Sequence, residues 1–145
     1  MEEKKYFFAV DLGATSGRTI IGTLNNDRIE LEELTLFDNN LIETGGKFYW
    51  DIYALYFEII KGLKLAAQRQ LNITSIGIDT WGVDYGLLDE NGKLIHLPFH
   101  YRDSRTENTV EKASEKMNLD SLYLATGNQI MNINTLFQLL SDDNT

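Results

Sequence analysis

A carboxylate, two hydroxyls and a cation follow one another closely near the start of the chain. Asp11 ends the apolar run over residues 6–10, and residues 13–18 then read Gly-Ala-Thr-Ser-Gly-Arg. The glycines allow a tight turn with exposed backbone N–H groups, and such a concavity suits an anion such as a phosphate. Asp11 can hold a hydrated Mg²⁺ beside that anion. These residue types at this spacing favour phosphate binding with a metal ion.

This stretch differs from a Walker-type P-loop. A P-loop ends in Gly-Lys-Ser/Thr and leads into a helix, whereas Arg18 begins another short apolar run, residues 18–24. We therefore predict a strand, a polar turn and a second strand. A plain hairpin turn whose glycines serve only the backbone geometry is the alternative, and residues 13–18 alone do not decide between the two.

Two later stretches also carry groups that can bind a polar ligand. Residues 79–84, Asp-Thr-Trp-Gly-Val-Asp, directly follow the apolar run 73–78, and residues 101–105 read Tyr-Arg-Asp-Ser-Arg. Each stretch has a structural alternative. In residues 79–84 the carboxylates would only end a strand and start a turn, and the tryptophan would pack in the core. In residues 101–105 the charges would form ion pairs at a solvated helix start, which contribute little stability. Neither His96 nor His100 has a partner in the sequence that would mark it as a catalytic base. We predict that His96 is an exposed strand residue and that His100 is a loop residue.

Hydrophobic patterning predicts the elements that position these groups. The turn Asn25-Asn26-Asp27 precedes residues 29–36, whose imperfect alternation across Glu32-Glu33 predicts an antiparallel strand with a bulge. Residues 51–69 have apolar side chains at helical spacing, with Asp51 as the N-cap. The sequence thus predicts a three-stranded meander followed by a crossover helix.

The apolar run 73–79 comes after this helix, so we expect a strand parallel to an earlier strand of the same sheet. The predicted fold class is therefore α/β with a mixed sheet. Ligands of open α/β sheets bind beyond the carboxyl ends of the parallel strands. Residues 11–18 and 79–84 would then face one cleft, with a nucleotide at the first stretch and a polar substrate at the second.

Shorter signals predict the remaining elements. They indicate a loop at Gly45-Gly46, a hairpin over residues 85–97 with an Asn-Gly turn, a helix from Ser104 or Thr106 to about Lys116, a short helix over residues 120–125, and a last helix capped by Asn134. No repeat, low-complexity stretch or linker interrupts the 145 residues. We expect one domain or part of a larger one.

Composition argues against several classes of function. The formal charge of −9 does not suit a nucleic-acid or anionic-membrane surface. With no cysteine, neither a disulfide nor a thiolate metal site can form, and two histidines are too few for a zinc site without carboxylate ligands. The apolar run near the N-terminus is too short for a signal peptide or a membrane span. We expect a cytoplasmic protein with no nucleic-acid or membrane partner.

Four segments resemble sugar kinases of the actin/hexokinase-like superfamily. Residues 8–18 resemble the first phosphate-binding segment of these kinases, and residues 75–85 are very similar to the matching segment of rhamnulokinases, which belong to the FGGY family of carbohydrate kinases. Residues 97–106 and 127–139 are similar too. The first segment is typical of many such kinases, whereas Asp-Thr-Trp-Gly-Val-Asp and Tyr-Arg-Asp-Ser-Arg-Thr are far more specific.

The resemblance implies a ribonuclease-H-like fold in two lobes with ATP in the cleft between them. A chain of 145 residues is too short for both lobes. We therefore expect residues 1–145 to be the amino-terminal part of the first lobe, whose last strand lies beyond Thr145. The family's catalytic aspartate, the general base for the sugar hydroxyl, is expected there as well, so the catalytic residue is unknown in this chain. We expect the isolated chain to be inactive and to expose apolar surface.

The resemblance and the residue positions together assign candidate site residues. Candidates for contacts with the ATP phosphates are Ala14, Thr15, Ser16, Gly17 and Arg18. Asp11 is the candidate for orienting Mg²⁺ through water. The resemblance places Gly82 against the sugar, where a side chain would block approach. Position alone adds, as further sugar contacts, Trp81, Asp79, Asp84 and Arg102.

The implied reaction is ATP-dependent phosphorylation of a ketose sugar. The favoured substrate is L-rhamnulose, which would be converted to L-rhamnulose 1-phosphate in rhamnose catabolism, with ATP and Mg²⁺ as cofactors. A kinase for xylulose, fuculose or glycerol is the alternative within the same family. A non-catalytic actin-like module that binds a nucleotide is the alternative from another class.

Overall fold

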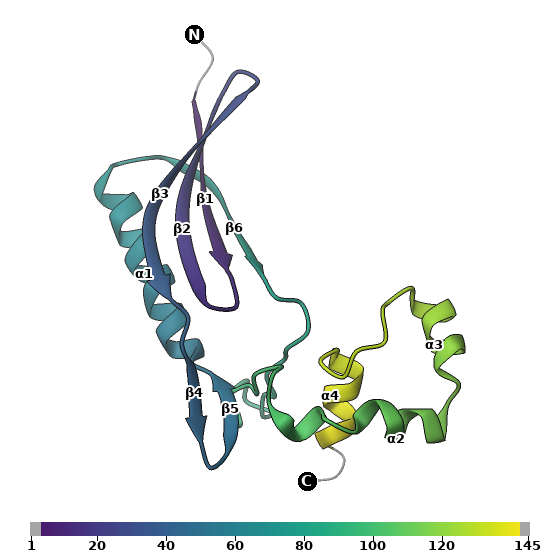
Figure 1. Cartoon of the computed structure of the whole chain (residues 1–145). Coiled ribbons are helices and arrows are strands. Elements are labelled where there is room, and N and C mark those ends of the chain that lie inside the picture. Colours follow the sequence, from purple (N-terminus) through teal and green to yellow (C-terminus); the bar gives the residue numbers. More distant parts are fainter. Residues whose placement is uncertain (1–3, 143–145) are drawn as a thin grey trace. The chain divides into compact units, whose positions relative to one another are not determined.

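A computed structural model describes residues 4–142 of the chain, which fall into two compact units (Figure 1). The first unit contains the residues up to Asn40 together with Asp51–Gly82. The second contains Leu41–Trp50 and the residues from Val83 onward. Each unit is therefore assembled from two separate segments of the chain.

The first unit is built on a four-stranded mixed sheet of order β3-β2-β1-β6. The strands are β1 (Lys5–Leu12), β2 (Ser16–Asn25), β3 (Arg28–Asp38) and β6 (Ile73–Thr80). The first three form an antiparallel meander, and β6 pairs parallel with β1. Thr19 lies opposite Thr35 while Ile20 lies opposite Glu33, so the bulge falls at Leu34. The predicted α/β fold class and mixed sheet are confirmed.

Helix α1 (Ile52–Gln68) is the crossover helix that precedes β6, and it covers one face of the meander (Figure 1). Its first turn is capped as predicted, because Asp51 Oδ1 accepts a hydrogen bond from the Ala54 N–H at 2.9 Å. Apolar side chains at helical spacing meet every second residue of the strands. The buried cluster that results comprises Phe8, Val10, Leu12, Ile21, Leu55 and Ala66.

One edge of the sheet leaves apolar side chains exposed. Ile76 and Ile78 of β6 lie opposite Phe8 and Val10 of β1, on the face that α1 covers elsewhere. They are nevertheless 54% and 58% exposed, whereas Phe8 and Val10 are buried. The expected exposure of apolar surface is therefore observed at this edge.

The second unit begins with a hairpin that the sequence did not predict. Strands β4 (Leu41–Thr44) and β5 (Lys47–Trp50) pair antiparallel, where the sequence indicated only a loop. Gly45 and Gly46 both have positive φ, 58° and 71°. This is the backbone that a two-residue hairpin turn requires. The glycine pair marks a tight turn between two short strands.

The remaining elements of the second unit are short and helical. They are the 3₁₀ helix η1 (Ser104–Thr106), α2 (Thr109–Lys116), α3 (Leu119–Thr126) and α4 (Thr135–Asp142). The predicted short helix over 120–125 is confirmed as α3, and α4 follows Asn134 as predicted. The Asn134 side chain does not cap α4 but donates to the Gln129 carbonyl oxygen.

Two predictions for the second unit were wrong in detail. The helix expected from Ser104 or Thr106 is split into η1 and α2, and its first turn is capped by Asp103. Asp103 accepts from the N–H groups of Phe48 and Arg105 and lies 3.7 Å from Lys47 Nζ, but it is buried and therefore not solvated. The hairpin expected over residues 85–97 is shorter than predicted. Its strands are reduced to one bridge between Leu88 and Leu94, with backbone hydrogen bonds from Asp89 to Lys93 and from Ile95 to Leu87.

Candidate functional site

Three charged side chains on neighbouring strands lie side by side at one end of the first unit's sheet. Asp11 on β1 lies opposite Arg18 on the antiparallel β2 and opposite Asp79 on the parallel β6. Opposed residues share a face of a sheet, and Phe8 and Val10, at the other parity of β1, face α1. The three charges therefore lie on the face away from α1, at the carboxyl ends of the parallel strands β1 and β6.

Arg18 forms weak, exposed ion pairs in this row. Its Nε lies 3.3 Å from Asp11 Oδ2 without hydrogen-bond geometry, and its Nη1 lies 4.0 Å from Glu33 Oε2. The side chains of Arg18 and Asp11 are 43% and 50% exposed. Ion pairs this exposed contribute about 0–1 kcal/mol. The guanidinium can therefore exchange a carboxylate partner for a phosphate at little cost in free energy.

The turn between β1 and β2 is shorter than the sequence indicated. Ser16 and Gly17 belong to β2, so only residues 13–15 connect the strands. The turn is closed by a hydrogen bond of 2.8 Å from the Gly13 N–H to the Ser16 carbonyl oxygen. The structure thus keeps the predicted strand–turn–strand order and places the turn directly beside Asp11 and Arg18.

Asp11 and Asp79 suit a magnesium ion that is shared with a phosphate. Mg²⁺ in such sites takes one or two protein carboxylates, and water and phosphate oxygens complete its octahedron. Among residues 4–142, no group of three or more histidine, cysteine, aspartate or glutamate side chains could hold a metal by itself. Two adjacent carboxylates on an open face fit a cation that the phosphate helps to hold.

Packing explains one of two glycines in the candidate site but not the other. A Cβ on Gly17 would lie 2.4 Å from a Phe37 ring carbon, so packing of the sheet requires glycine there. A Cβ on Gly82 would meet nothing within 4 Å, and Gly82 does not have positive φ. Neither packing nor backbone conformation within the described residues explains Gly82.

The other candidate sugar contacts have partners within their own units. Trp81 is half-buried and packs against the first unit's core. Asp84 belongs to the second unit, where its Oδ2 accepts from Trp50 Nε1 at 2.5 Å and its Oδ1 from Gln138 Nε2 at 2.7 Å. Arg102, also in the second unit, is exposed with its guanidinium 5.4 Å from the Tyr101 ring centroid. Among the candidate site residues, the strand pairing sets Asp11 opposite both Arg18 and Asp79.

Gln138 is the centre of a buried polar network that sequence reasoning missed. Besides Asp84, its Nε2 contacts the carbonyl oxygens of Val83 and Ile133, at 3.1 and 2.9 Å. Its Oε1 accepts from Arg105 Nη2 at 2.7 Å. Arg105 continues the network to Asp142 and lies 4.2 Å from the Phe99 ring centroid. A glutamine on a short helix gives no local signal of this role, because its partners come from three other segments.

His100 is a loop residue, as predicted, but it is buried. Only 2% of it is exposed, and its ring stacks on Trp50 with centroids 4.0 Å apart. Its Nδ1 accepts from the Arg102 N–H at 3.0 Å, so Nε2 carries the proton of the neutral ring. Burial lowers the pKa of His100 below its ordinary value of 6.5. The charge of Arg102 also lowers this pKa, while the charges of Asp84 and Asp103 raise it by less.

The lowered pKa of His100 predicts a pH dependence of stability. The unfolded chain binds the proton near pH 6.5 and the folded chain resists it, so the free energy of unfolding should fall as the pH drops below 6.5. Urea unfolding between pH 7.5 and 5.5 measures this slope. His100→Gln should flatten the slope, and the matched His96→Gln should retain it. Equal slopes in wild type and His100→Gln would contradict the assignment.

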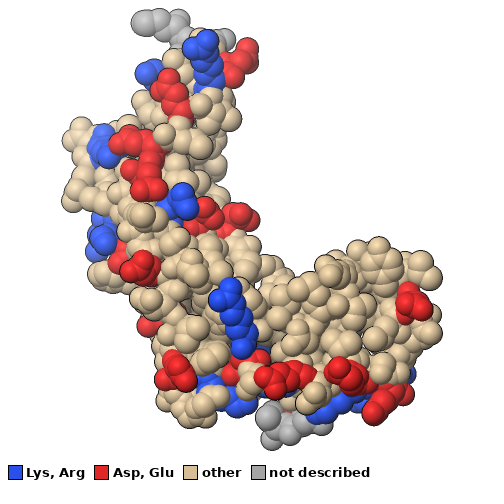
Figure 2. All heavy atoms as spheres, viewed as in Figure 1, with Lys and Arg blue, Asp and Glu red and all other residues tan. Residues whose placement is uncertain are grey.

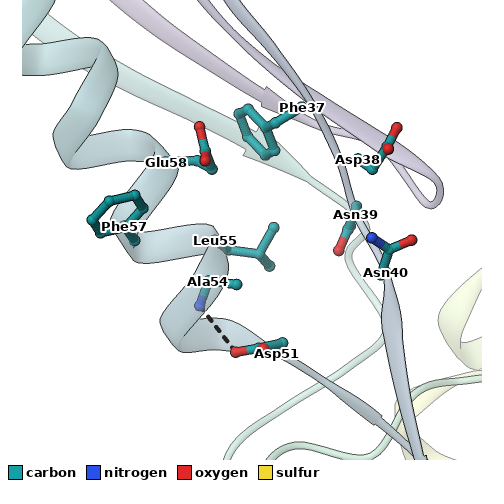
Figure 3. A pocket seen from close by; sticks show the side chains of 9 residues that line it. All are labelled: Phe37, Asp38, Asn39, Asn40, Asp51, Ala54, Leu55, Phe57 and Glu58. Carbon is teal, nitrogen blue, oxygen red and sulfur yellow. Dashed lines mark hydrogen bonds between the residues drawn. The ribbon is translucent and has the colours of Figure 1, made fainter.

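An open pocket of about 330 Å³ lies between the end of β3 and the first turns of α1 (Figure 3). Its walls combine acidic, amide and aromatic side chains: Phe37, Asp38, Asn39, Asn40, Asp51, Ala54, Leu55, Phe57 and Glu58. Asn39 also contacts the Gly13–Ser16 turn through its side chain, at 2.8 Å from the Gly13 carbonyl oxygen. The pocket therefore lies next to a residue that touches the candidate phosphate turn.

The distribution of charge fits the composition. Figure 2 shows acidic and basic side chains interspersed over the face in view, with no single basic patch on that face.

None of the helices in the described part of the chain is both long and apolar enough to span a bilayer.

Comparison with known proteins assigns the family. The profile described as "FGGY family of carbohydrate kinases, N-terminal domain" matches residues 6–140. The chain belongs to the FGGY family of carbohydrate kinases. FGGY relatives include a rhamnulokinase from Bacteroides thetaiotaomicron, which is 55% identical over 136 residues and covers 94% of this chain. Another is a rhamnulokinase from Oceanobacillus iheyensis, 45% identical over 131 residues and covering 90% of the chain.

Solved structures agree with the FGGY assignment at the level of the fold. A gluconate kinase from Lactobacillus acidophilus matches with a TM-score of 0.77 at 17% identity, over 99% of this chain and 29% of its own. A ligand-bound xylulose kinase from the same organism matches with a TM-score of 0.75 at 17% identity, over 97% and 29%. The chain spans 28% of the length of each of the two rhamnulokinases. The actin/hexokinase-like fold of a sugar-kinase N-terminal domain is confirmed.

Proposed function

We propose that the chain is the amino-terminal part of the first lobe of a longer kinase that transfers phosphate from ATP to a ketose sugar. The observation that carries the proposal is the parallel pairing of β1 with β6, which sets Asp11 beside Asp79. The phosphate-type turn and the sugar-type segment then follow adjacent strand ends, where open α/β sheets bind ligands. Arg18 adds a cation at the same end.

The nucleotide would bind at the turn. Ala14, Thr15 and Ser16 offer backbone N–H groups and two hydroxyls, and Gly17 leads to the Arg18 guanidinium, which suits a charge-assisted phosphate contact. Asp11 would orient Mg²⁺ through water. Mg²⁺ at such a site neutralises the charge that develops on the transferred phosphate.

The sugar would bind beyond the end of β6. Gly82 is the main candidate, because nothing in the described structure occupies the space of its missing side chain. Asp79 offers an exposed carboxylate to a hydroxyl, and Trp81 directly precedes Gly82. Asp84 and Arg102 are the further candidates for sugar contacts. We propose L-rhamnulose as the sugar, phosphorylated to L-rhamnulose 1-phosphate. The support is the 55% and 45% identity to rhamnulokinases.

A substrate panel on the longer kinase tests this function. L-rhamnulose, xylulose, fuculose and glycerol would each be supplied with ATP and Mg²⁺, and ADP release measured. We expect the highest kcat/KM with L-rhamnulose. Activity with xylulose or fuculose but not with rhamnulose would overturn the choice of sugar, and no sugar-dependent ADP release at all would overturn the kinase itself.

Arg18→Ala should weaken the ATP site of the longer kinase. Loss of a charge-assisted hydrogen bond to phosphate should raise the KM for ATP about 10–100-fold, with little change in the KM for the sugar. Arg28→Ala, which removes the same charge at the far end of β3, is the matched control. Steady-state kinetics with both substrates varied gives the comparison, and an unchanged KM and kcat for ATP would remove Arg18 from the site.

A further inference from the structure

The turn between β1 and β2 is held from outside by Asn39, the first residue after β3. Asn39 Nδ2 donates a hydrogen bond of 2.8 Å to the carbonyl oxygen of Gly13. The Asn39 backbone N–H donates one of 3.0 Å to the carbonyl oxygen of Thr15. Only 6% of Asn39 is exposed. One buried residue thus binds two alternate carbonyl groups of a three-residue turn.

These two hydrogen bonds fix the direction of two N–H groups as well. In a trans peptide the C=O of one residue and the N–H of the next point to opposite sides, and no peptide bond in the described chain is cis. Because the Gly13 carbonyl points to Asn39, the N–H of Ala14 points away from it. The Thr15 carbonyl sets the Ser16 N–H in the same manner. Two N–H groups of the turn are therefore directed away from Asn39.

We propose that Asn39 is a positioning residue that orients the Ala14 and Ser16 N–H groups toward a phosphate of the nucleotide. The proposal rests on the proposed function of the turn and adds to it a residue outside residues 11–18. Backbone N–H groups that point to the same side of a turn suit an anion. Replacing the Asn39 side chain would leave the backbone hydrogen bond to Thr15 in place but release the peptide plane between Gly13 and Ala14. The Ala14 N–H would then have to be ordered when the phosphate binds.

Asn39→Asp is the sharpest variant, because the carboxylate keeps the shape of the side chain but cannot donate to the Gly13 carbonyl. Asn40→Asp is a matched control: Asn40 is the next residue, is exposed, lines the same pocket and takes on the same charge (Figure 3). Both variants would be made in the longer kinase. The measurements are the KM for ATP, the KM for the sugar, and hydrogen–deuterium exchange of the peptide covering residues 10–18.

We expect Asn39→Asp to raise the KM for ATP about tenfold or more, to leave the KM for the sugar within about twofold, and to speed exchange in residues 10–18. Asn40→Asp should match wild type in all three. A wild-type KM for ATP and wild-type exchange in Asn39→Asp would overturn the proposal, as would equal effects of the two variants. If the wild-type kinase shows no ATP-dependent transfer, the proposed function fails, while the exchange data still decide whether Asn39 holds the turn.

Discussion

Replacing Gln138 with leucine is expected to lower the free energy of unfolding of the second unit by about 3–5 kcal/mol. The leucine side chain is one bond shorter than that of glutamine and can form no hydrogen bond. Asp84 Oδ1 and Arg105 Nη2 each lose a partner, and so do the carbonyl oxygens of Val83 and Ile133. Gln138 is 1% exposed, so water does not replace these bonds readily.

The two tryptophans make this measurement specific to one unit. Trp50 belongs to the second unit and Trp81 to the first, so a Trp81→Phe background leaves Trp50 fluorescence as the reporter during urea unfolding. Gln129→Leu, the same replacement at an exposed position of the second unit, serves as the control and should cost less than about 0.5 kcal/mol. A Gln138→Leu variant that unfolds at the wild-type urea concentration would show that the network adds no net stability.

The 145-residue chain on its own is expected to release no ADP in a sugar-dependent manner. Phosphoryl transfer needs an oriented nucleophile, a group that accepts its proton, and cations around the phosphates. The first unit offers only part of the proposed phosphate site, in Arg18 and Asp11. His100 is buried against Trp50 with a lowered pKa, and both oxygens of Asp84 accept hydrogen bonds, so neither suits the role of base.

A coupled assay with ATP, Mg²⁺ and L-rhamnulose tests the isolated chain, with the longer kinase as the positive control under the same conditions. The rate should equal that of the sugar-free blank. Sugar-dependent ADP release by the purified, monomeric chain would refute this expectation. Asp79→Asn and Asp84→Asn would then identify which carboxylate accepts the proton.

The first unit could be predicted well because its signals are local. The Asn25-Asn26-Asp27 turn, the Asp51 cap and the apolar run 73–79 each specify one element, and the rule for crossover connections supplies the parallel pairing. That rule predicts residues 11–18 and 79–84 at one cleft, and the structure adds the register that sets Asp11 opposite Asp79. The bulge lies at Leu34, directly after the Glu32-Glu33 pair that indicated it, because a break in the alternation does not show which residue is unpaired.

The second unit could not be predicted in the same way, since its order depends on contacts between distant residues. The β4–β5 hairpin has only four residues a strand, too few for a period to show beside Gly45-Gly46. The burial of His100 depends on Trp50, fifty residues earlier in the sequence. Asn39 likewise has no pattern of its own, and its role is visible only once β3 lies beside β2.

The discontinuous second unit also sets an order of events during synthesis. Trp50 leaves the ribosome early, but its unit also needs Gln138, which is 138 − 50 = 88 residues later. At about 5–20 residues per second, that interval lasts roughly 4–18 s. The first unit has all its strands by Thr80 and can form in the meantime, while the β4–β5 hairpin waits with an unburied tryptophan. During this interval the first unit can be folded while residues 41–50, which lie between its two segments in the sequence, still lack their partners from the second unit. A chaperone has time to bind residues 41–50 at this stage.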